Sequence, residues 1–202
     1  MNRRELLSLF AFATPALALP RLARAEGECG PPNPYGAASC AMGIPSWRAG
    51  TIEADQDNSQ WCWAACIQMV LKHYRYDIDQ ADIVRQVFGR EVNLPADPWT
   101  LVAALNRRYV NDEGDRFGLV SGPADLAIAR AELIAGRPLI VGTLGHAMVL
   151  TAFSTVETPF GFEVVDAVVR DPWPTSGGRR SLNAREFHNI EFLAYMRSED
   201  EL

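Results

Sequence analysis

The chain has 202 residues, of which 48% are hydrophobic and 22% are charged. A length near 200 corresponds to one globular domain or two very small ones, and this composition excludes a disordered chain, a collagen-like repeat and a coiled coil. The formal net charge of −6 argues against a nucleic-acid partner bound through a basic surface.

The first 25 residues are typical of a bacterial export signal. Two arginines at positions 3 and 4 precede an apolar stretch over residues 6–19, and residues 23–25 supply an A-x-A cleavage site. The adjacent arginines suit a twin-arginine signal, although the apolar stretch would equally suit the general secretory route. No charge-free apolar run of 18 residues follows, so no membrane association is expected of the mature form. We therefore expect the mature protein in the periplasm or outside the cell.

Removal of this signal leaves 15 basic and 24 acidic residues and a formal charge of −9. Residues 26–50 are rich in glycine, proline and small side chains, which predicts an irregular N-terminal arm before a domain over residues 51–202. Cys29 and Cys40 flank a Pro/Gly-rich loop in this arm. An oxidising compartment would permit a structural disulfide between them.

Helices are expected in the first half of the domain. The segment WCWAACIQMVLKHY over residues 61–74 is apolar nearly all round and lacks Gly and Pro, which predicts a buried central helix. Cap and stop signals predict three further helices, over residues 79–88, 99–109 and 124–135.

Strand patterns replace helical ones after Pro138. Short, β-branched apolar segments lie over residues 138–144, 146–153 and 162–170, separated by turn signals. Asn183 is expected to cap one more helical turn, and residues 190–197 predict a last strand. Because helices precede strands instead of alternating with them, the sequence predicts an α+β domain, with an N-terminal helical half packed against a C-terminal antiparallel sheet.

Three residues in this arrangement have the chemistry needed for acyl transfer. Cys62 begins the buried helix, where unpaired N–H groups favour a thiolate. His146 opens one predicted strand, and Asp171 follows the next one. A thiolate can attack a carbonyl, and an imidazolium held by a carboxylate can protonate the leaving amine. The backbone N–H of Cys62 and a side-chain amide, from Gln56 or Gln60, could stabilise the oxyanion.

The predicted hairpin brings His146 and Asp171 together. With its turn centred near residues 157–158, His146 would face Val169, and Asp171 would lie one diagonal step away, within side-chain reach. Asp166 is the competing carboxylate. Because it is an odd number of residues from Asp171, it points to the opposite face of a regular strand.

These residues carry a resemblance to papain-like cysteine peptidases. The Q-x5-C-W-A signature of the family is present as Gln56-x5-Cys62-Trp63-Ala64. The start of the histidine strand is matched by Gly145-His146-Ala147. Plant and lysosomal members then have an Asn followed two residues later by a Trp, and at that place this chain has Arg170-Asp171-Pro172-Trp173. Asp-Pro in place of Asn-Ser, and the small size, look more like the bacterial branches, which include secreted and effector proteases and the bacteriocin leader peptidases. The resemblance covers roughly residues 50–195.

The resemblance implies a papain-like fold with Cys62 as nucleophile, His146 as general base, Asp171 as orienting carboxylate and Gln56 as oxyanion donor. The implied activity is hydrolysis of peptide or isopeptide bonds in a peptide or protein substrate, through a thioester and without a cofactor or metal. An alternative on the same triad is acyl transfer to an amine, as in a transglutaminase. A catalytically silent binding module is a third hypothesis, and the intact site positions argue against it.

The remaining candidates are given structural roles. Cys66 lies one helical turn after Cys62 and is expected to be a buried thiol, with a disulfide to the N-terminal arm as the next choice. The resemblance implies that Trp173 shields the His–Asp hydrogen bond from water. His73 and His188 are expected at the surface or as capping residues. The arginine pair at positions 179 and 180 lies in a Ser/Gly loop and is expected to be solvated.

Overall fold

The computed structural model describes residues 27–97, 99–101, 109–110, 114, 116–122 and 124–198. The predicted export signal over residues 1–25 lies outside these ranges, as do residues 102–108 of the predicted third helix. Residues 99–101 are helical, and the carboxylate of Asp97 accepts the N–H groups of Trp99 and Thr100. Tyr109, which was expected to end this helix, belongs to a strand instead.

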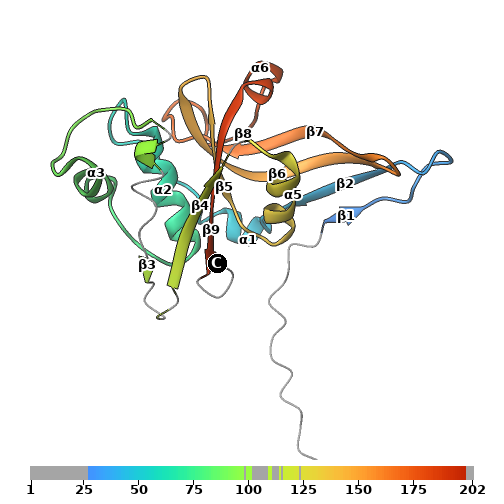
Figure 1. Ribbon diagram of the computed structural model, residues 1–202, viewed down its shortest axis with the longest axis horizontal. Coiled ribbons are helices and arrows are strands. Elements are labelled where there is room, and N and C mark those ends of the chain that lie inside the picture. The colour runs from blue at the N-terminus through green and yellow to red at the C-terminus, as the bar shows by residue number, and fades with distance from the viewer. Residues whose placement is uncertain are drawn as a thin grey trace, which may run out of the picture.

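Two strands, β1 and β2, come first, and from α1 onward helices precede most of the strands, as predicted (Figure 1). They are β1 (Glu28–Cys29), β2 (Ala38–Gly43), α1 (Ser46–Ala49), α2 (Cys62–His73), α3 (Gln80–Phe88), β3 (Tyr109–Val110), β4 (Arg116–Gly122), α5 (Leu126–Ile134), β5 (Leu139–Thr143), β6 (His146–Thr158), β7 (Gly161–Arg170), β8 (Arg179–Ser181), α6 (Ala184–His188) and β9 (Ile190–Ser198). None of the helices in the described ranges is both long enough and apolar enough to cross a membrane.

Local signals place the predicted helices correctly. The α3 helix begins after Asp79 and ends before Gly89, whose φ of 72° is a left-handed conformation that favours glycine. Asp125 caps α5 by accepting two backbone N–H groups. Asn183 caps α6 in a capping box with Glu186, in which each side chain accepts the other residue's backbone N–H.

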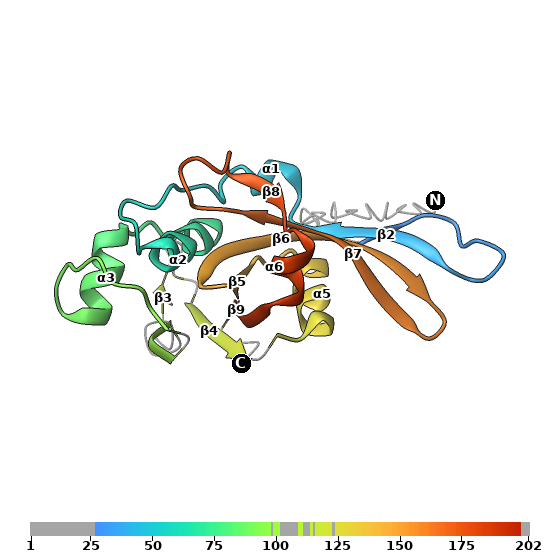
Figure 2. The ribbon, with the colours of Figure 1, turned by 90° about the horizontal axis from the view of Figure 1, so that it is seen from above.

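Over the part of the chain that the structure describes, nine strands form one antiparallel sheet in the order β1-β2-β6-β5-β9-β4-β3, with β7 paired to β6 and β8 to β7. The long strand β6 organises this sheet, because β5 pairs with its first half, β2 with its second half and β7 with nearly its whole length. Figure 2 shows β2, β6 and β7 extending together away from α2 and α3.

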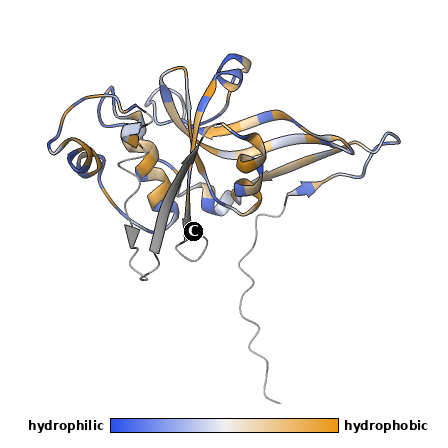
Figure 3. Cartoon of the chain, viewed as in Figure 1, coloured by the Kyte–Doolittle hydropathy of each residue, from blue (hydrophilic) through white to orange (hydrophobic). Residues whose placement is uncertain are grey.

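Two hydrophobic cores lie on opposite faces of the sheet. Ile140, Ala147 and Val149 pack in the core that contains α2. The alternate residues Val141 and Met148 pack in the core that contains α5. Both faces of β5 and of the first half of β6 are therefore covered, which explains their continuous apolar sequence. The hydrophobic colouring of α2 in Figure 3 agrees with its place in the first core.

The N-terminal segment differs from the predicted irregular arm. Residues 27–50 contain β1, β2 and α1, and β2 pairs with β6 from Ala38 opposite Glu157 to Gly43 opposite Ala152. Strand formation there depends on an available edge of β6, which the local composition does not reveal. A side chain on Gly43 would come within 2.6 Å of the Ala152 Cβ atom, so the close approach of the two strands requires glycine.

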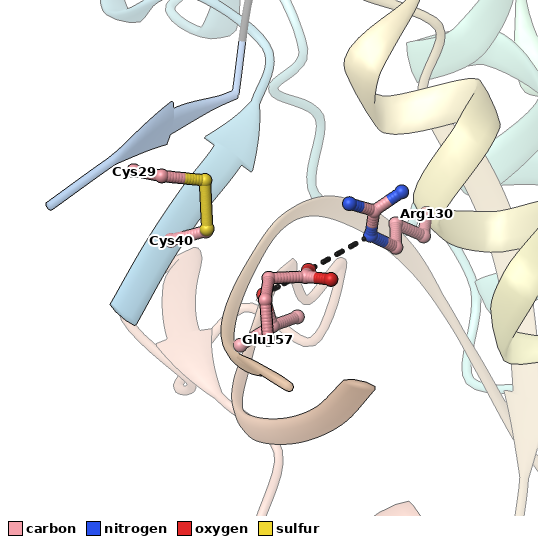
Figure 4. The surroundings of a disulfide bond; sticks show 5 residues. Cys29, Cys40, Arg130 and Glu157 are labelled. Atoms are coloured by element: carbon pink, nitrogen blue, oxygen red, sulfur yellow. Dashed lines mark hydrogen bonds and ion pairs between the residues drawn. A yellow bond between two sulfur atoms is a disulfide. The ribbon is translucent and has the colours of Figure 1, made fainter. Parts of the chain in front are cut away.

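The predicted disulfide between Cys29 and Cys40 is present. It joins directly opposite residues of β1 and β2. Figure 4 shows this disulfide near the ion pair between Arg130 of α5 and Glu157 of β6, whose N and O atoms are 3.0 Å apart.

The β6–β7 hairpin turns later than predicted. Thr158 pairs with Gly161, and it is Leu150, not His146, that faces Val169. The register is therefore shifted by four residues. Because side chains alternate with a period of two and the two register irregularities lie farther along the hairpin, beyond Leu150, His146 and Asp171 stay on one face and within reach of each other.

Candidate active site

Cys62 is the first residue of α2 and is half-buried. Two buried tryptophans hold this end of the helix in place. The indole N–H of Trp61 donates to the carbonyl of Val92 at 2.8 Å, and that of Trp63 donates to the carbonyl of Leu94 at 3.2 Å. The start of α2 is thereby tied to the segment that follows α3.

His146 and Asp171 lie at the ends of the two hairpin strands and meet. The Nε2 atom of His146 is 2.8 Å from Oδ1 of Asp171, and the imidazole lies beside Cys62 in the same cleft, close enough for each to shift the pKa of the other. Since Nε2 is used by Asp171, Nδ1 is the ring nitrogen left for the sulfur. Trp173 packs edge-on against the imidazole, with ring centroids 6.4 Å apart. The indole thus lies beside the His–Asp pair, where the resemblance to papain-like peptidases implies it.

The electrostatics favour a thiolate–imidazolium pair. Burial by itself would raise the pKa of Cys62, but the hydrogen bond and charge of His146, together with the backbone N–H groups of Ala147 and Trp63, lower it. Burial would lower the pKa of His146, but hydrogen bonds and charge interactions with Asp171 and Cys62 raise it to about 9. The cysteine therefore loses its proton more easily than a free thiol, and the histidine keeps one.

Asp171 is 5% exposed and remains ionised. Burial would raise its pKa, but hydrogen bonds from His146, the Trp173 backbone N–H and Arg180 lower it to about 2. Trp173 N–H reaches Oδ1 at 2.9 Å, and Nε of Arg180 reaches Oδ2 at 2.8 Å. Both carboxylate oxygens are therefore occupied by donors.

Arg180 is a residue of the site that the sequence analysis missed. It was expected to be solvated, but only 27% of its side chain is exposed. Its two terminal nitrogens bind the two carboxylate oxygens of Glu186 at 2.8 Å each. Arg180 reaches Asp171 because β8 pairs with β7, where Arg180 lies opposite Val169. The Ser/Gly-rich sequence before Arg180 does not indicate this strand pairing.

Asp166, the competing carboxylate, lies elsewhere. It pairs with Ser154, eight residues from His146, which is about 26 Å along β6 at the usual rise per residue. It lines a separate pocket with Phe187 and His188. The structure therefore brings Asp171, and not Asp166, to the histidine.

Gln56 and Gln60 lie in the loop before α2 in different surroundings. Gln56 is buried, its side-chain N–H donates to the carbonyl of Asn58 at 2.8 Å, and its Oε1 has no hydrogen-bond partner within the described ranges. Its backbone N–H donates to the carbonyl of Pro172, which ties the loop to the residue after Asp171. Gln60, in contrast, lines the cleft beside Cys62.

A cleft of about 310 Å³ begins at Cys62 and His146. Most of its other walls are apolar, and two carboxylates lie among them. The apolar lining residues are Trp63, Pro95, Ala96, Leu101, Ala147 and Phe192, and the acidic ones are Asp97 and Glu191. The cleft is open to solvent and has room for a peptide side chain next to the sulfur.

Cys66 and the other two histidines take no part in this constellation. Cys66 is a free, fully buried thiol as predicted, and burial raises its pKa well above the usual value. His73 was expected at the surface or as a capping residue but is buried against the Gly136 carbonyl, and burial lowers its pKa to about 4. His188 is exposed. Among the described residues, His, Cys, Asp and Glu form no group of three that could hold a metal ion.

Comparisons with known proteins agree with this geometry. A family model described as "Peptidase_C39 like family" matches residues 50–199. The chain is also similar to the crystal structure of the peptidase domain of Streptococcus ComA, a bi-functional ABC transporter involved in a quorum-sensing pathway. That match has a TM-score of 0.50 and 19% identity and covers 71% of this chain and 95% of that one. It confirms the predicted papain-like α+β fold. No curated protein matches the sequence significantly.

Proposed function

The chain belongs to the peptidase C39-like family of cysteine peptidases, and we propose that it hydrolyses peptide or isopeptide bonds through a triad of Cys62, His146 and Asp171. The observation that carries this proposal is the convergence of Cys62, His146 and the buried carboxylate of Asp171 at an open cleft, with Nε2 of His146 2.8 Å from Oδ1 of Asp171. Each member has the protonation state that acyl transfer needs.

Acylation begins from the thiolate–imidazolium pair. The sulfur of Cys62 attacks the carbonyl carbon of the scissile bond, a C–S bond forms, and the carbonyl π electrons move to the oxygen. When this oxyanion collapses, the C–N bond breaks and His146 gives its proton to the leaving amine. A thioester on Cys62 and a neutral imidazole remain.

Deacylation restores the starting state. The neutral His146 takes a proton from a water molecule, and the oxygen of that water attacks the thioester carbon. The C–S bond breaks, the carboxylic acid product leaves, and thiolate and imidazolium are regenerated. Asp171 stays ionised throughout and stabilises the imidazolium while holding its ring in one orientation.

The oxyanion needs hydrogen-bond donors beside Cys62. The Cys62 backbone N–H, at the first position of α2, and the side-chain amide of Gln56 are the donors we propose. One N–H of the Gln56 side-chain amide donates to the carbonyl of Asn58, and the second N–H can donate to the substrate oxyanion. Gln60 is the alternative amide because it lines the cleft.

We propose that the enzyme is exported and acts in the periplasm or outside the cell. The signal-like pattern over residues 1–25 supports this location. The Cys29–Cys40 disulfide is a second support, because such bonds persist in oxidising compartments.

The proposal is tested with the purified protein and its Cys62→Ala variant in mild reductant, using a mixed pool of fluorogenic peptides. We expect turnover that the variant lacks entirely. The value of kcat/KM should rise with pH as the thiolate–imidazolium pair forms, below the pKa of a free thiol, and should fall as His146 loses its proton near pH 9.

Two further measurements separate the alternatives. Addition of a primary amine distinguishes hydrolysis from acyl transfer, because an acyltransferase would incorporate the amine into the product. Alkylation of Cys62 by iodoacetamide as a function of pH reports the thiolate without any substrate. An unreactive Cys62 with an ordinary pKa, and no cleavage of any peptide, would overturn the enzyme proposal in favour of a binding module.

A further inference from the structure

A cluster of charged side chains continues beyond the triad to β8 and α6. Arg180 of β8 donates Nε–H to Oδ2 of Asp171, and its two terminal nitrogens hold the carboxylate of Glu186 in a fork. One oxygen of Glu186 also accepts the backbone N–H of Asn183. The guanidinium is therefore fixed at both ends, and it can bind Asp171 in only one orientation.

Arg180 also separates two carboxylates. Asp171 and Glu186 repel each other, and this repulsion by itself would raise the pKa of Glu186. The ionisable groups around Asp171 are Cys62 and Cys66 from α2, His146 from β6, Arg180 from β8 and Glu186 from α6. Without the arginine, Oδ2 of Asp171 would be a buried acceptor with no other hydrogen-bond donor among the described residues, and a like charge would lie nearby.

The α6 helix holds the histidine strand as well. The backbone carbonyl of Glu186 accepts the hydroxyl of Thr143 at 2.7 Å. Thr143 is the last residue of β5 and pairs directly with His146. Glu186 therefore contacts the supports of both triad residues, the aspartate through its side chain and Arg180, and the histidine through its backbone and Thr143.

From these contacts we infer that Arg180 and Glu186 are positioning residues of the triad, with Arg180 orienting Asp171 toward His146 and Glu186 orienting Arg180. Neither residue lines the cleft beside Cys62. Their side chains, which the variants below change, therefore act on the reaction through Asp171, whereas the backbone carbonyl that Glu186 offers to Thr143 is kept in every variant. This inference rests on the proposed triad and extends it by a second layer of charged side chains.

The test compares Arg180→Gln, Arg180→Lys and Glu186→Gln with Arg179→Gln. Arg179 is a matched control, because it is the adjacent residue of β8 and is exposed. For Arg180→Gln we expect a fall in kcat of about ten- to a hundredfold with little change in KM, because a hydrogen bond to a charged group is lost. Arg180→Lys keeps the charge but not the fork, so its loss should be smaller, and so should that of Glu186→Gln.

Two readouts need no substrate and would not respond to a merely structural role. The pKa of Asp171, followed by NMR through its carboxyl carbon signal, should rise above the wild-type value of about 2 in Arg180→Gln. In Arg179→Gln it should keep the wild-type value. The rate of Cys62 alkylation near neutral pH should fall in the same order as kcat. These readouts remain informative even if the wild-type protein cleaves no peptide, so failure of the proposed peptidase function can be told apart from failure of this inference.

An Arg180→Gln protein with normal kcat, normal alkylation and an unchanged Asp171 titration would overturn the inference. Lower thermal stability with kcat retained would also overturn it, since Arg180 would then only support β8. If Arg180→Gln does not fold, Arg180→Lys and Glu186→Gln decide the question. Glu186→Gln keeps an amide oxygen that can accept the Asn183 N–H, so the cap of α6 is preserved.

Discussion

The two ends of the β6–β7 hairpin differ in burial and in what they carry. At the base, from His146 to about Leu150 on β6, side chains are buried on both faces of the strand. At the tip the β7 residues alternate between exposed and half-buried, and Phe160 in the turn is fully exposed. The base lies between α2 on one face and α5 on the other, whereas the tip is bordered by β2.

This difference shows that the two ends of one hairpin are held in place by different interactions. At the base the covered strands fix His146 and the residue that follows β7, so the His–Asp geometry depends on packing from two cores. The tip is held by other means, namely the disulfide that ties β1 to β2 and the ion pair between Arg130 and Glu157 (Figure 4). Substitutions at the base should therefore affect activity, and substitutions at the tip should affect stability.

The largest contrast is expected between the two aspartates of the hairpin. Asp171→Ala should lower kcat/KM by about 10⁴-fold, the scale known for loss of a triad carboxylate. It should also shift the alkaline limb of the pH profile downward, because Asp171 helps to raise the pKa of His146. Asp166→Ala, which lies outside the base opposite Ser154, should leave kcat/KM unchanged. Equal losses in the two variants would contradict the assignment of Asp171.

A smaller effect is expected from substitutions in the loop before α2, which is tied to the base by the hydrogen bond from the Gln56 backbone N–H to the Pro172 carbonyl. Gln56→Ala should lower kcat by about 10²- to 10³-fold if its amide stabilises the oxyanion. Gln60→Ala is the matched comparison, and its loss should be smaller and mainly in KM, because this residue lines the cleft. The opposite ranking, measured by steady-state kinetics, would assign the oxyanion amide to Gln60.

At the tip side the disulfide should matter for stability alone. Replacement of Cys29 and Cys40 by serine removes a cross-link that closes an 11-residue separation, which should cost roughly 2–3 kcal/mol of unfolding free energy. The kcat value should not change, because neither residue lies near Cys62. Urea denaturation and peptide cleavage, measured on the same sample, check both parts. A loss of kcat in the folded variant would show that the tip and the base are coupled.

The smallest effect is expected in the turns at the two ends of β6, and it should be a gain. Leu144, in the two-residue turn before His146, has a φ of 52°, which is strained for a leucine. Leu144→Asn gives the Asn-Gly sequence that such turns favour and should raise the free energy of unfolding by about 1 kcal/mol. Phe160, in the tip turn, does not have a positive φ, so Phe160→Asn should not raise the free energy of unfolding. Thermal denaturation of the two variants measures both effects.

Sequence patterns predicted much of the helical half and the position of Cys62 at the start of α2. Helix α2, the stop of α3 at Gly89 and the capping box at Asn183 all follow from residues within one or two turns of each other. The short signature around Cys62 was informative for the same reason. The predicted meeting of His146 and Asp171 was also confirmed, because an error of four residues in the hairpin register leaves these two residues on the same side of the sheet.

The sequence by itself determined the elements with local signals, because caps, stops and apolar periodicity act over a few residues. Only the tertiary structure decided the features that depend on which strands become neighbours. The pairing of β2 with β6 turned a loop-like composition into sheet, and the pairing of β8 with β7 placed Arg180 against Asp171. In both cases the decisive partner is distant in sequence or lies across a loop, and neither composition nor periodicity encodes its approach.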